Sequence, residues 1–287
     1  MEIIVGKTAG FCYGVKNATD KTMQILEENR ENKVYCLGEL VHNKQVVEKL
    51  ERMGLFVVEN VDLLPKSENK NNKVIIRAHG VGKDVYKKIE ELNYQYVDLT
   101  CPNVLNIHKI VQNYIKNGYY IFLVGQKNHP EVLGTYGWCE GKCTIIEKED
   151  DIEEVSKNIQ ADKILVVAQT TFSLEKFNKF VDIIKDKINK EIEIKNTICN
   201  ATKLRQEETE NFSKEVEKMI IIGGKNSSNT KKLYDIASKI TSTVLIETVA
   251  EIDLEEFKKY KRIGIMAGAS TPQESIDGCV AALKMLS

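Results

Sequence analysis

The sequence predicts an α/β protein of three similar units, each containing a mostly parallel sheet. Three cysteines, Cys12, Cys101 and Cys199, recur at intervals of 89 and 98 residues, about a third of the 287-residue chain. Each cysteine stands where an apolar, strand-like segment gives way to a helical pattern. Two further blocks recur in the same order after each cysteine, and alternating strands and helices are typical of parallel sheets. The units are predicted at residues 1–97, 98–194 and 195–287.

The segments beside the three cysteines predict a strand before and a helix after each one. The strands are expected at residues 3–5, 96–99 and 192–194. After the first two cysteines, apolar residues keep helical spacing over residues 15–26 and 104–115. The stretch 200–216 is more polar, but it contains neither Gly nor Pro, so a helix is predicted there as well.

A second block, a short apolar strand that ends in glycine and a polar loop, follows each cysteine. Its glycines, which come 26, 24 and 24 residues after the cysteines, are Gly38, Gly125 and Gly223. The polar landmarks four residues after these glycines are His42, His129 and Ser227. A third block repeats an apolar strand followed by small and polar residues, and its aligned alanines are Ala78, Ala168 and Ala267. Each block predicts a strand leading into a helix.

The positions of the cysteines predict a shared site. In open parallel sheets, ligands bind beyond the carboxyl ends of the strands, where loops lead into helix N-termini. If the units pack with these ends inward, the three cysteines converge as soft thiolate ligands, which suits a metal or an iron–sulfur cluster. Iron–sulfur clusters usually take four cysteines. Three would leave one iron open to a substrate, as catalytic zinc sites keep one position free, so the pattern favours catalysis over electron transfer alone.

The other four cysteines do not share this phase. Cys139 and Cys143 form an isolated pair with no second pair at zinc spacing, and we interpret them as structural or incidental. Cys36 lies inside an expected strand and Cys279 on an apolar C-terminal stretch, so both are expected in the core. A non-catalytic zinc or redox protein that uses Cys139 and Cys143 remains an alternative.

The charge balance excludes some classes of partner. Lys and Arg number 41 against 42 Asp and Glu, a formal net charge of -1, so neither a nucleic acid nor an anionic membrane is expected to bind. The apolar runs are far shorter than a membrane span. The start of the chain lacks the basic segment and long apolar core of a secretory signal, so a cytoplasmic protein is expected.

Polar residues in the repeated loops predict an anion site built chiefly from neutral donors. Three of the four histidines fall in these loops, whereas His108 falls on the apolar stripe of its helix and is expected to pack. Lys127 and Lys225 are near, but no glycine-rich phosphate motif follows a strand. Glu131 is the carboxylate that the loop places beside the expected cluster, so it is the candidate proton donor. The candidate anion donors are His42, His79, His129, Ser227, Ser228, Asn229 and Ser270.

Nine ordered motifs run along nearly the whole chain, among them GFCYGV at residues 10–15, TCP at 100–102 and HPEVLG at 129–134. The others are residues 38–43, 77–80, 169–171, 197–199, 225–229 and 267–272. Together they resemble the 4-hydroxy-3-methylbut-2-enyl diphosphate reductase (LytB/IspH) family. The resemblance implies a trefoil of three α/β units around a 4Fe-4S cluster, with one iron open to substrate. The implied cluster ligands are Cys12, Cys101 and Cys199.

The same resemblance implies a reaction. It is the reductive dehydroxylation of (E)-4-hydroxy-3-methylbut-2-enyl diphosphate to isopentenyl and dimethylallyl diphosphates, the last step of the methylerythritol phosphate route to isoprenoids. Reduced ferredoxin or flavodoxin is the implied electron donor. The seven anion donors would hold the diphosphate, and Thr170 with Glu131 would contact the hydroxyl end and relay protons. The enzymatic alternative is a quinolinate-synthase-like dehydratase, which also has three units, with one cysteine in each, around an open cluster.

Overall fold

All strand pairings in the computed structural model, which describes residues 1–286, are parallel. The strands form three four-stranded sheets, and helices alternate with them along the chain. The predicted α/β class with three parallel sheets is therefore confirmed. Within the same residues, no helix is both long enough and apolar enough to cross a membrane.

The chain folds into two compact units. Unit 1 comprises Met1–Lys16, Val41–Lys49 and the residues from Asn200 onward, and unit 2 comprises Asn17–Leu40 and Leu50–Cys199. Two of the three sheets belong to unit 2, and the remaining sheet belongs to unit 1. The division predicted at residues 97 and 194 stays a prediction.

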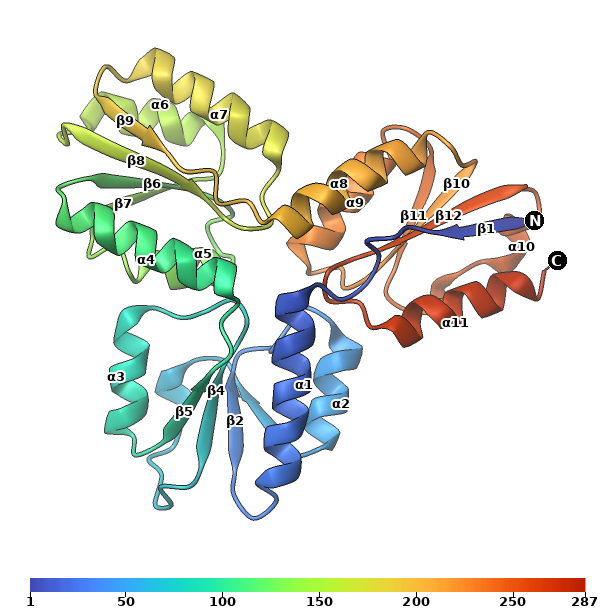
Figure 1. Ribbon diagram of the computed structural model, residues 1–287, viewed down its shortest axis with the longest axis horizontal. Helices are drawn as coiled ribbons and strands as arrows, with labels where there is room; N and C mark the ends of the chain where they lie inside the picture. The colour runs from blue at the N-terminus through green and yellow to red at the C-terminus, as the bar shows by residue number, and fades with distance from the viewer. Residues whose placement is uncertain (287) are drawn as a thin grey trace. The chain divides into compact units, whose positions relative to one another are not determined.

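The first sheet lies in unit 2. Its strands are β2 (Val34–Leu37), β3 (Leu55–Val58), β4 (Lys73–Ile76) and β5 (Gln95–Asp98), in the spatial order β3-β2-β4-β5. The helices of this part of the chain are α1 (Tyr13–Glu28), α2 (Lys44–Arg52), the short η1 (Val61–Leu63) and α3 (Lys83–Glu91). Helix α3 covers one face of the sheet (Figure 1), where its Ile89 packs with Val74 and Ile76.

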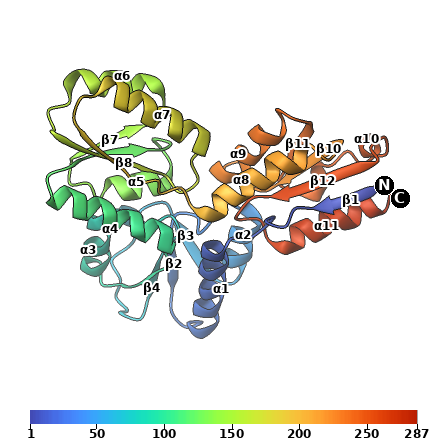
Figure 2. The ribbon, with the colours of Figure 1, turned by 45° about the horizontal axis from the view of Figure 1, so that its top comes forward.

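The second sheet also lies in unit 2. Its strands are β6 (Tyr120–Val124), β7 (Cys143–Ile146), β8 (Lys163–Ala168) and β9 (Glu191–Ile194), in the order β7-β6-β8-β9. Its helices are α4 (Pro102–Lys116), α5 (Pro130–Tyr136), α6 (Glu149–Asn158) and α7 (Leu174–Lys187). Helices α6 and α7 cover one face, and α4 and α5 cover the other (Figure 2). Because side chains alternate along a strand, Phe122 packs beneath α7 while Leu123 packs against α4.

The third sheet lies in unit 1. Its strands are β1 (Glu2–Val5), β10 (Lys218–Ile222), β11 (Ser242–Ile246) and β12 (Arg262–Ala267), in the order β1-β12-β10-β11. Its helices are α8 (Asn200–Ser213), α9 (Ser228–Ala237), the short η2 (Val249–Glu251), α10 (Leu254–Phe257) and α11 (Gln273–Lys284). The first two cover one face, while α10 and α11 cover the other (Figure 1). The helix predicted over residues 200–216 is therefore present as α8.

The first strand of the chain completes the sheet formed by its last third. Strand β1 pairs with β12, although residues 3–5 precede the strands of the first sheet in the sequence. Strand β1, which precedes Cys12, is an outer strand of its sheet. In the other two sheets, the outer strand β5 precedes Cys101 and the outer strand β9 precedes Cys199. Each in-phase cysteine therefore follows the outer strand of a sheet, at its carboxyl end.

Candidate active site

Three equivalent turns hold the three in-phase cysteines. After β4, β8 and β12, a backbone hydrogen bond of 3.0 Å closes the same four-residue turn at residues 77–80, 169–172 and 268–271. The carbonyl of the second turn residue then accepts the amide N–H of a cysteine. The pairs are Cys101 to Ala78 at 3.0 Å, Cys199 to Thr170 at 2.9 Å and Cys12 to Ala269 at 3.1 Å.

These hydrogen bonds correct the alignment of the third block. In the sequence, Ala78 aligns with Ala168 and Ala267, but the turns make Ala78 equivalent to Thr170 and Ala269. The difference arises because β4 ends two residues before Ala78, whereas β8 and β12 end at their alanines. The residues at the third position of the three turns, which are therefore equivalent, are His79, Thr171 and Ser270.

The in-phase cysteines differ from the other four in exposure. Cys12, Cys101 and Cys199 form no disulfide and are half-buried, and each directly precedes a helix: α1, α4 or α8. Cys36, Cys139, Cys143 and Cys279 are free but buried. Cysteine sulfur is a soft ligand that suits iron–sulfur clusters, and a half-buried thiol remains accessible to one. The chemistry and accessibility of the three in-phase thiols therefore fit an iron–sulfur cluster.

The out-of-phase cysteines have the expected structural character. Burial raises the pKa of both Cys36 and Cys279 to about 12. Cys143 is hydrogen-bonded to Cys139, and this contact together with burial raises its pKa. Cys139 in turn donates to the carbonyl of Thr135 at 3.3 Å inside the core of the second sheet. Because these four thiols are buried inside hydrophobic cores, the structure does not favour the zinc alternative.

In unit 1, the loop that carries His42 is held against the third sheet. Ser270 donates its hydroxyl to the carbonyl of His42 at 3.0 Å. A Cβ atom at Gly224 would lie 2.5 Å from the same carbonyl, so only glycine allows this approach of the two loops. His42, Ser270 and the loop before α9 therefore form one surface at the carboxyl ends of β10 and β12.

The N-terminus of α9 supplies the remaining candidate donors of unit 1. Ser227 is its N-cap and accepts from the amide of Thr230 at 3.3 Å, and Ser228 is the first helical residue. Asn229 is only 3% exposed, and neither atom of its side-chain amide has a hydrogen-bond partner. A buried, unpaired amide is costly unless a ligand satisfies it. Its presence at a helix N-terminus fits an anionic ligand.

In the second block, the position of the helix N-cap differs by one residue among the three copies. The structural N-caps after the three glycines are Asn43, His129 and Ser227, because Asn43 accepts the amide of Val46 at 3.1 Å at the start of α2. In the first copy the cap therefore lies five residues after Gly38, and His42 precedes it. The sequence did not reveal this, since Asn43 and His42 are both plausible polar landmarks.

In unit 2, two candidate histidines lie together. The rings of His79 and His129 have centroids 5.5 Å apart in an edge-to-face arrangement. His79 comes from the turn after β4, and His129 caps α5 by accepting the amide of Glu131 at 3.2 Å. Two different sheets thus contribute donors to one region of unit 2.

Glu131 is buried and bound by Thr170. The amide and the hydroxyl of Thr170 each donate to one carboxylate oxygen at 2.6 Å. Burial raises the pKa of Glu131 to about 7, although both hydrogen bonds from Thr170 act to lower it. The carboxyl group is therefore poised to hold or release a proton near neutral pH. Since the Thr170 carbonyl also accepts the amide of Cys199, Thr170 links this carboxyl group to a candidate ligand.

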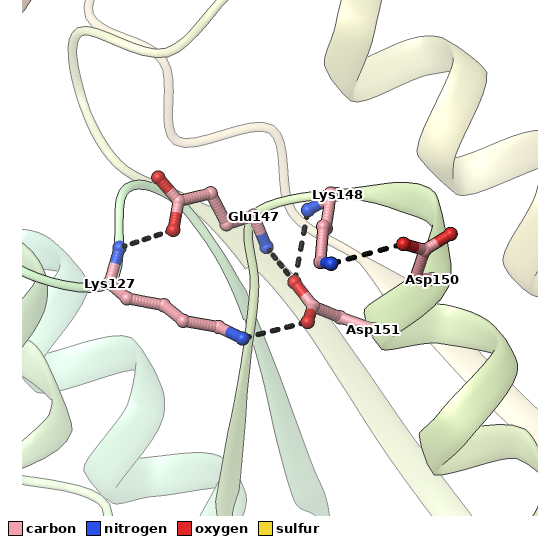
Figure 3. A network of polar contacts seen from close by, with 5 residues as sticks. All are labelled: Lys127, Glu147, Lys148, Asp150 and Asp151. Atoms are coloured by element: carbon pink, nitrogen blue, oxygen red, sulfur yellow. Dashed lines mark hydrogen bonds and ion pairs between the residues drawn. The ribbon is translucent and has the colours of Figure 1, made fainter.

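The two nearby lysines are engaged by carboxylates. Lys127 pairs with Asp151 at 2.7 Å, and the carboxylate of Asp151 also accepts the amides of Glu147 and Lys148 (Figure 3). In unit 1, Lys225 pairs with Glu251 at 2.6 Å in the same way. These ammonium groups brace the loops rather than standing free, which fits an anion site built chiefly from neutral donors.

His108 has the packing role that its position on the helix predicts. It is 2% exposed, and its ring stacks on Trp138 with centroids 5.1 Å apart. Burial lowers its pKa to about 4, so the ring is neutral at physiological pH. Trp138 donates its indole N–H to the carbonyl of Val81 at 2.8 Å, which ties the end of α5 to the turn that carries His79.

The candidate residues thus fall into two groups. Unit 1 places Cys12 with the donors His42, Ser227, Ser228, Asn229 and Ser270, and unit 2 places Cys101 and Cys199 with His79, His129, Glu131 and Thr170. One residue near these groups was not indicated by the sequence. Asn103 donates its side-chain amide to the sulfur of Cys199 at 3.0 Å, a contact across 96 positions that no local pattern could reveal.

Sequence comparisons give consistent matches over the whole chain. Residues 3–284 match the LytB protein family. The 4-hydroxy-3-methylbut-2-enyl diphosphate reductase of Clostridioides difficile (strain 630) is 43% identical over 286 residues, which cover 100% of both chains. The protein of the same name from Aquifex aeolicus (strain VF5) is 41% identical over 281 residues and covers 96% of this chain and 94% of its own.

Solved structures are also similar. A structure described as (E)-4-hydroxy-3-methyl-but-2-enyl diphosphate reductase, the terminal enzyme of the non-mevalonate pathway, is 40% identical, with a TM-score of 0.72 and coverage of 99% of this chain and 100% of that one. The E-1-hydroxy-2-methyl-but-2-enyl-4-diphosphate reductase from Plasmodium falciparum is 29% identical, with a TM-score of 0.90 and coverage of 99% and 88%. The chain belongs to the LytB family of 4-hydroxy-3-methylbut-2-enyl diphosphate reductases, which are iron–sulfur enzymes.

Proposed function

We propose that this protein reduces (E)-4-hydroxy-3-methylbut-2-enyl diphosphate to isopentenyl and dimethylallyl diphosphates. Two electrons and two protons are consumed, the allylic C–O bond breaks, a C–H bond forms and the hydroxyl leaves as water. The observation that carries the proposal is that three half-buried cysteines directly precede helices and donate their amides to equivalent turns, while the other four are buried. The named relatives favour this substrate over the dicarboxylate chemistry of a quinolinate-synthase-like enzyme.

The proposed cofactor is a 4Fe-4S cluster held by Cys12, Cys101 and Cys199, with one iron free of protein ligands. When bound, the cluster supplies the electrons and a Lewis acid for the substrate hydroxyl. The protein contributes the fixed positions of the thiols, because each cysteine amide is tied to the turn after a central strand. Reduced ferredoxin or flavodoxin is the proposed electron donor.

The proposed diphosphate donors are neutral groups. His42, Ser227, Ser228 and Asn229 of unit 1 and His79 and His129 of unit 2 would each donate to phosphate oxygens, and Ser270 of unit 1 would do so by turning its hydroxyl from the His42 carbonyl. The buried unpaired amide of Asn229 supports this role, and so does the N-terminus of α9, whose backbone amides favour anions. Because Lys127 and Lys225 already pair with carboxylates, hydrogen bonds from uncharged groups would contribute most of the binding of the diphosphate.

Glu131 and Thr170 form the proposed proton relay. A carboxyl group with a pKa of about 7 can deliver a proton to the leaving hydroxyl and recover one from solvent within a turnover. Thr170 donates to both carboxylate oxygens and thereby fixes the orientation of the carboxyl group.

The proposed compartment is the cytoplasm. None of the seven cysteines, all of which the structure describes, forms a disulfide, and a reducing compartment keeps thiols in that state. The proposed division into units at residues 1–97, 98–194 and 195–287 gives each unit one in-phase cysteine.

Anaerobic reconstitution tests the proposal. Wild-type protein should bind iron and labile sulfide and consume the hydroxylated allylic diphosphate in the presence of a reduced low-potential donor. Cys101→Ser should lose the brown absorbance, whereas Cys279→Ala, which changes a buried thiol, should keep it. Loaded wild-type protein that leaves the diphosphate unconsumed would count against the substrate, and full cluster content in Cys101→Ser would mean that the ligand is wrong.

A further inference from the structure

Asn103 contacts a proposed cluster ligand. It is the second residue of α4 and therefore lies two residues after Cys101, yet its Nδ2 atom donates to the Sγ atom of Cys199 at 3.0 Å. Both residues belong to unit 2. The amide of Cys199 is fixed independently by the carbonyl of Thr170 at 2.9 Å. Cys199 is thus fixed through its backbone amide, and its sulfur accepts a hydrogen bond from a neutral donor.

A hydrogen bond to a ligand sulfur changes the energy of electron transfer. Reduction adds negative charge to an iron–sulfur cluster and its thiolates, so a donor at a sulfur stabilises the reduced form more than the oxidised form. The side chain of Asn103 carries no net charge, so it acts through this hydrogen bond alone. We propose that Asn103 is a positioning residue that raises the reduction potential of the cluster by donating to Cys199. This inference rests on the proposed ligand set.

The position of Asn103 permits a clean substitution. The residue is exposed and lies in the first turn of α4, where leucine forms a helix at least as well as asparagine. Asn103→Leu therefore removes the donor without opening a cavity. Asn106 offers a matched control, since it is also an exposed asparagine on α4, one turn later.

The experiment measures the reduction potential of reconstituted wild type, Asn103→Leu, Asn103→Ser and Asn106→Leu by anaerobic titration monitored by absorbance and electron paramagnetic resonance. Asn103→Leu should lower the equilibrium constant for one-electron reduction by roughly tenfold, which corresponds to about 59 mV. Asn103→Ser keeps a short donor and should recover part of the shift. Asn106→Leu should match wild type. Circular dichroism checks that α4 is retained in every variant.

Three outcomes would overturn the inference. Equal potentials in wild type and Asn103→Leu would show that the hydrogen bond does not act on the cluster. An equal shift in Asn106→Leu would assign the effect to the helix rather than to the donor. Loss of the cluster from both Asn103 variants, with Asn106→Leu fully loaded, would assign Asn103 to assembly instead. Failure of the proposed cofactor is distinguishable, because wild-type protein would then contain no iron and sulfide.

Discussion

At the scale of single residues, burial decides the chemistry of the site. Glu131 is 2% exposed, and the cost of burying its charge exceeds the benefit of two hydrogen bonds from Thr170. Its carboxyl group therefore stays protonated to about pH 7, where an exposed glutamate would be ionised. Asn103 illustrates the opposite case, in which an exposed neutral side chain affects the site through one contact.

Replacing Glu131 tests the proton relay. Glu131→Gln retains the shape of the side chain and an oxygen that can accept the Thr170 amide, but it cannot transfer the proton, so turnover should fall by roughly 10²–10⁴-fold. Iron and sulfide content should match wild type, because the residue is not a proposed ligand. Steady-state rates with a reduced low-potential donor provide the measurement. Near-normal rates in the fully loaded variant would remove Glu131 from the mechanism.

The raised pKa of Glu131 also predicts a pH dependence of stability. Between pH 4.5, the ordinary value, and about 7, the folded protein keeps a proton that the unfolded chain releases. Stability attributable to this group therefore falls as pH rises through that window, by up to about 3 kcal/mol. Glu131→Gln lacks this cost, so the variant should gain stability relative to wild type as pH rises from 5 to 8.

Urea denaturation of both cluster-free proteins across this pH range measures the difference. Other titrating groups cancel when the two curves are subtracted, because they are common to both proteins. A difference in unfolding free energy that stays constant with pH would mean that Glu131 titrates near its ordinary value.

At the scale of elements, the same brace recurs in two of the three repeats. Asp151 accepts two backbone amides and the ammonium of Lys127 in the second sheet, and Glu251 does the same with Lys225 in the third. The first sheet has Leu40 at the equivalent position, two residues after its glycine. Each brace ties the loop after a central strand to the segment that follows the next strand of its sheet, so it fixes the loop that leads to a candidate donor.

The two members of a brace should differ in their contribution to stability. Asp151→Ala strands two backbone amides at the start of α6, so it should lower the unfolding free energy by about 1–2 kcal/mol. Lys127→Met removes one ion pair, and the Lys127 side chain is 48% exposed, so the substitution should cost less than about 1 kcal/mol. Denaturant titration gives both values. A larger loss in Lys127→Met than in Asp151→Ala would contradict the assignment of the backbone amides as the main partners.

At the scale of the whole molecule, the repeat was visible in the sequence because its marks are local. A strand that ends in glycine or before a cysteine leaves a pattern within ten residues, so the three sheets and the helices beginning after Cys12, Cys101 and Cys199 could be predicted. The four buried cysteines were recognised by their lack of phase. Contacts between distant segments left no such pattern. Three features depend on the tertiary fold: the hydrogen bond from Asn103 to Cys199, the N-cap at Asn43, and the alignment that makes Ala78 equivalent to Thr170.

The pairing of β1 with β12 is the largest feature that local patterns could not supply, and it can be tested directly. Ile4 packs between the third sheet and α8 together with Met266 and Phe212, so Ile4→Asp buries a charge there and should cost about 1–3 kcal/mol. Hydrogen exchange should accelerate in residues 262–267, because β12 loses its neighbour.

Residues 34–37 and 73–76 of the first sheet should keep their exchange rates in Ile4→Asp, although they follow β1 in the sequence. Val5→Asp is the matched control, since Val5 ends the same strand but is 38% exposed and should tolerate the charge. Mass spectrometry of peptic fragments resolves these segments. Faster exchange confined to residues 34–37 and 73–76 would place the first strand in the first sheet. Faster exchange at 262–267 alone would establish that the two ends of the chain share one sheet, so that the third repeat is complete only when the first strand joins it.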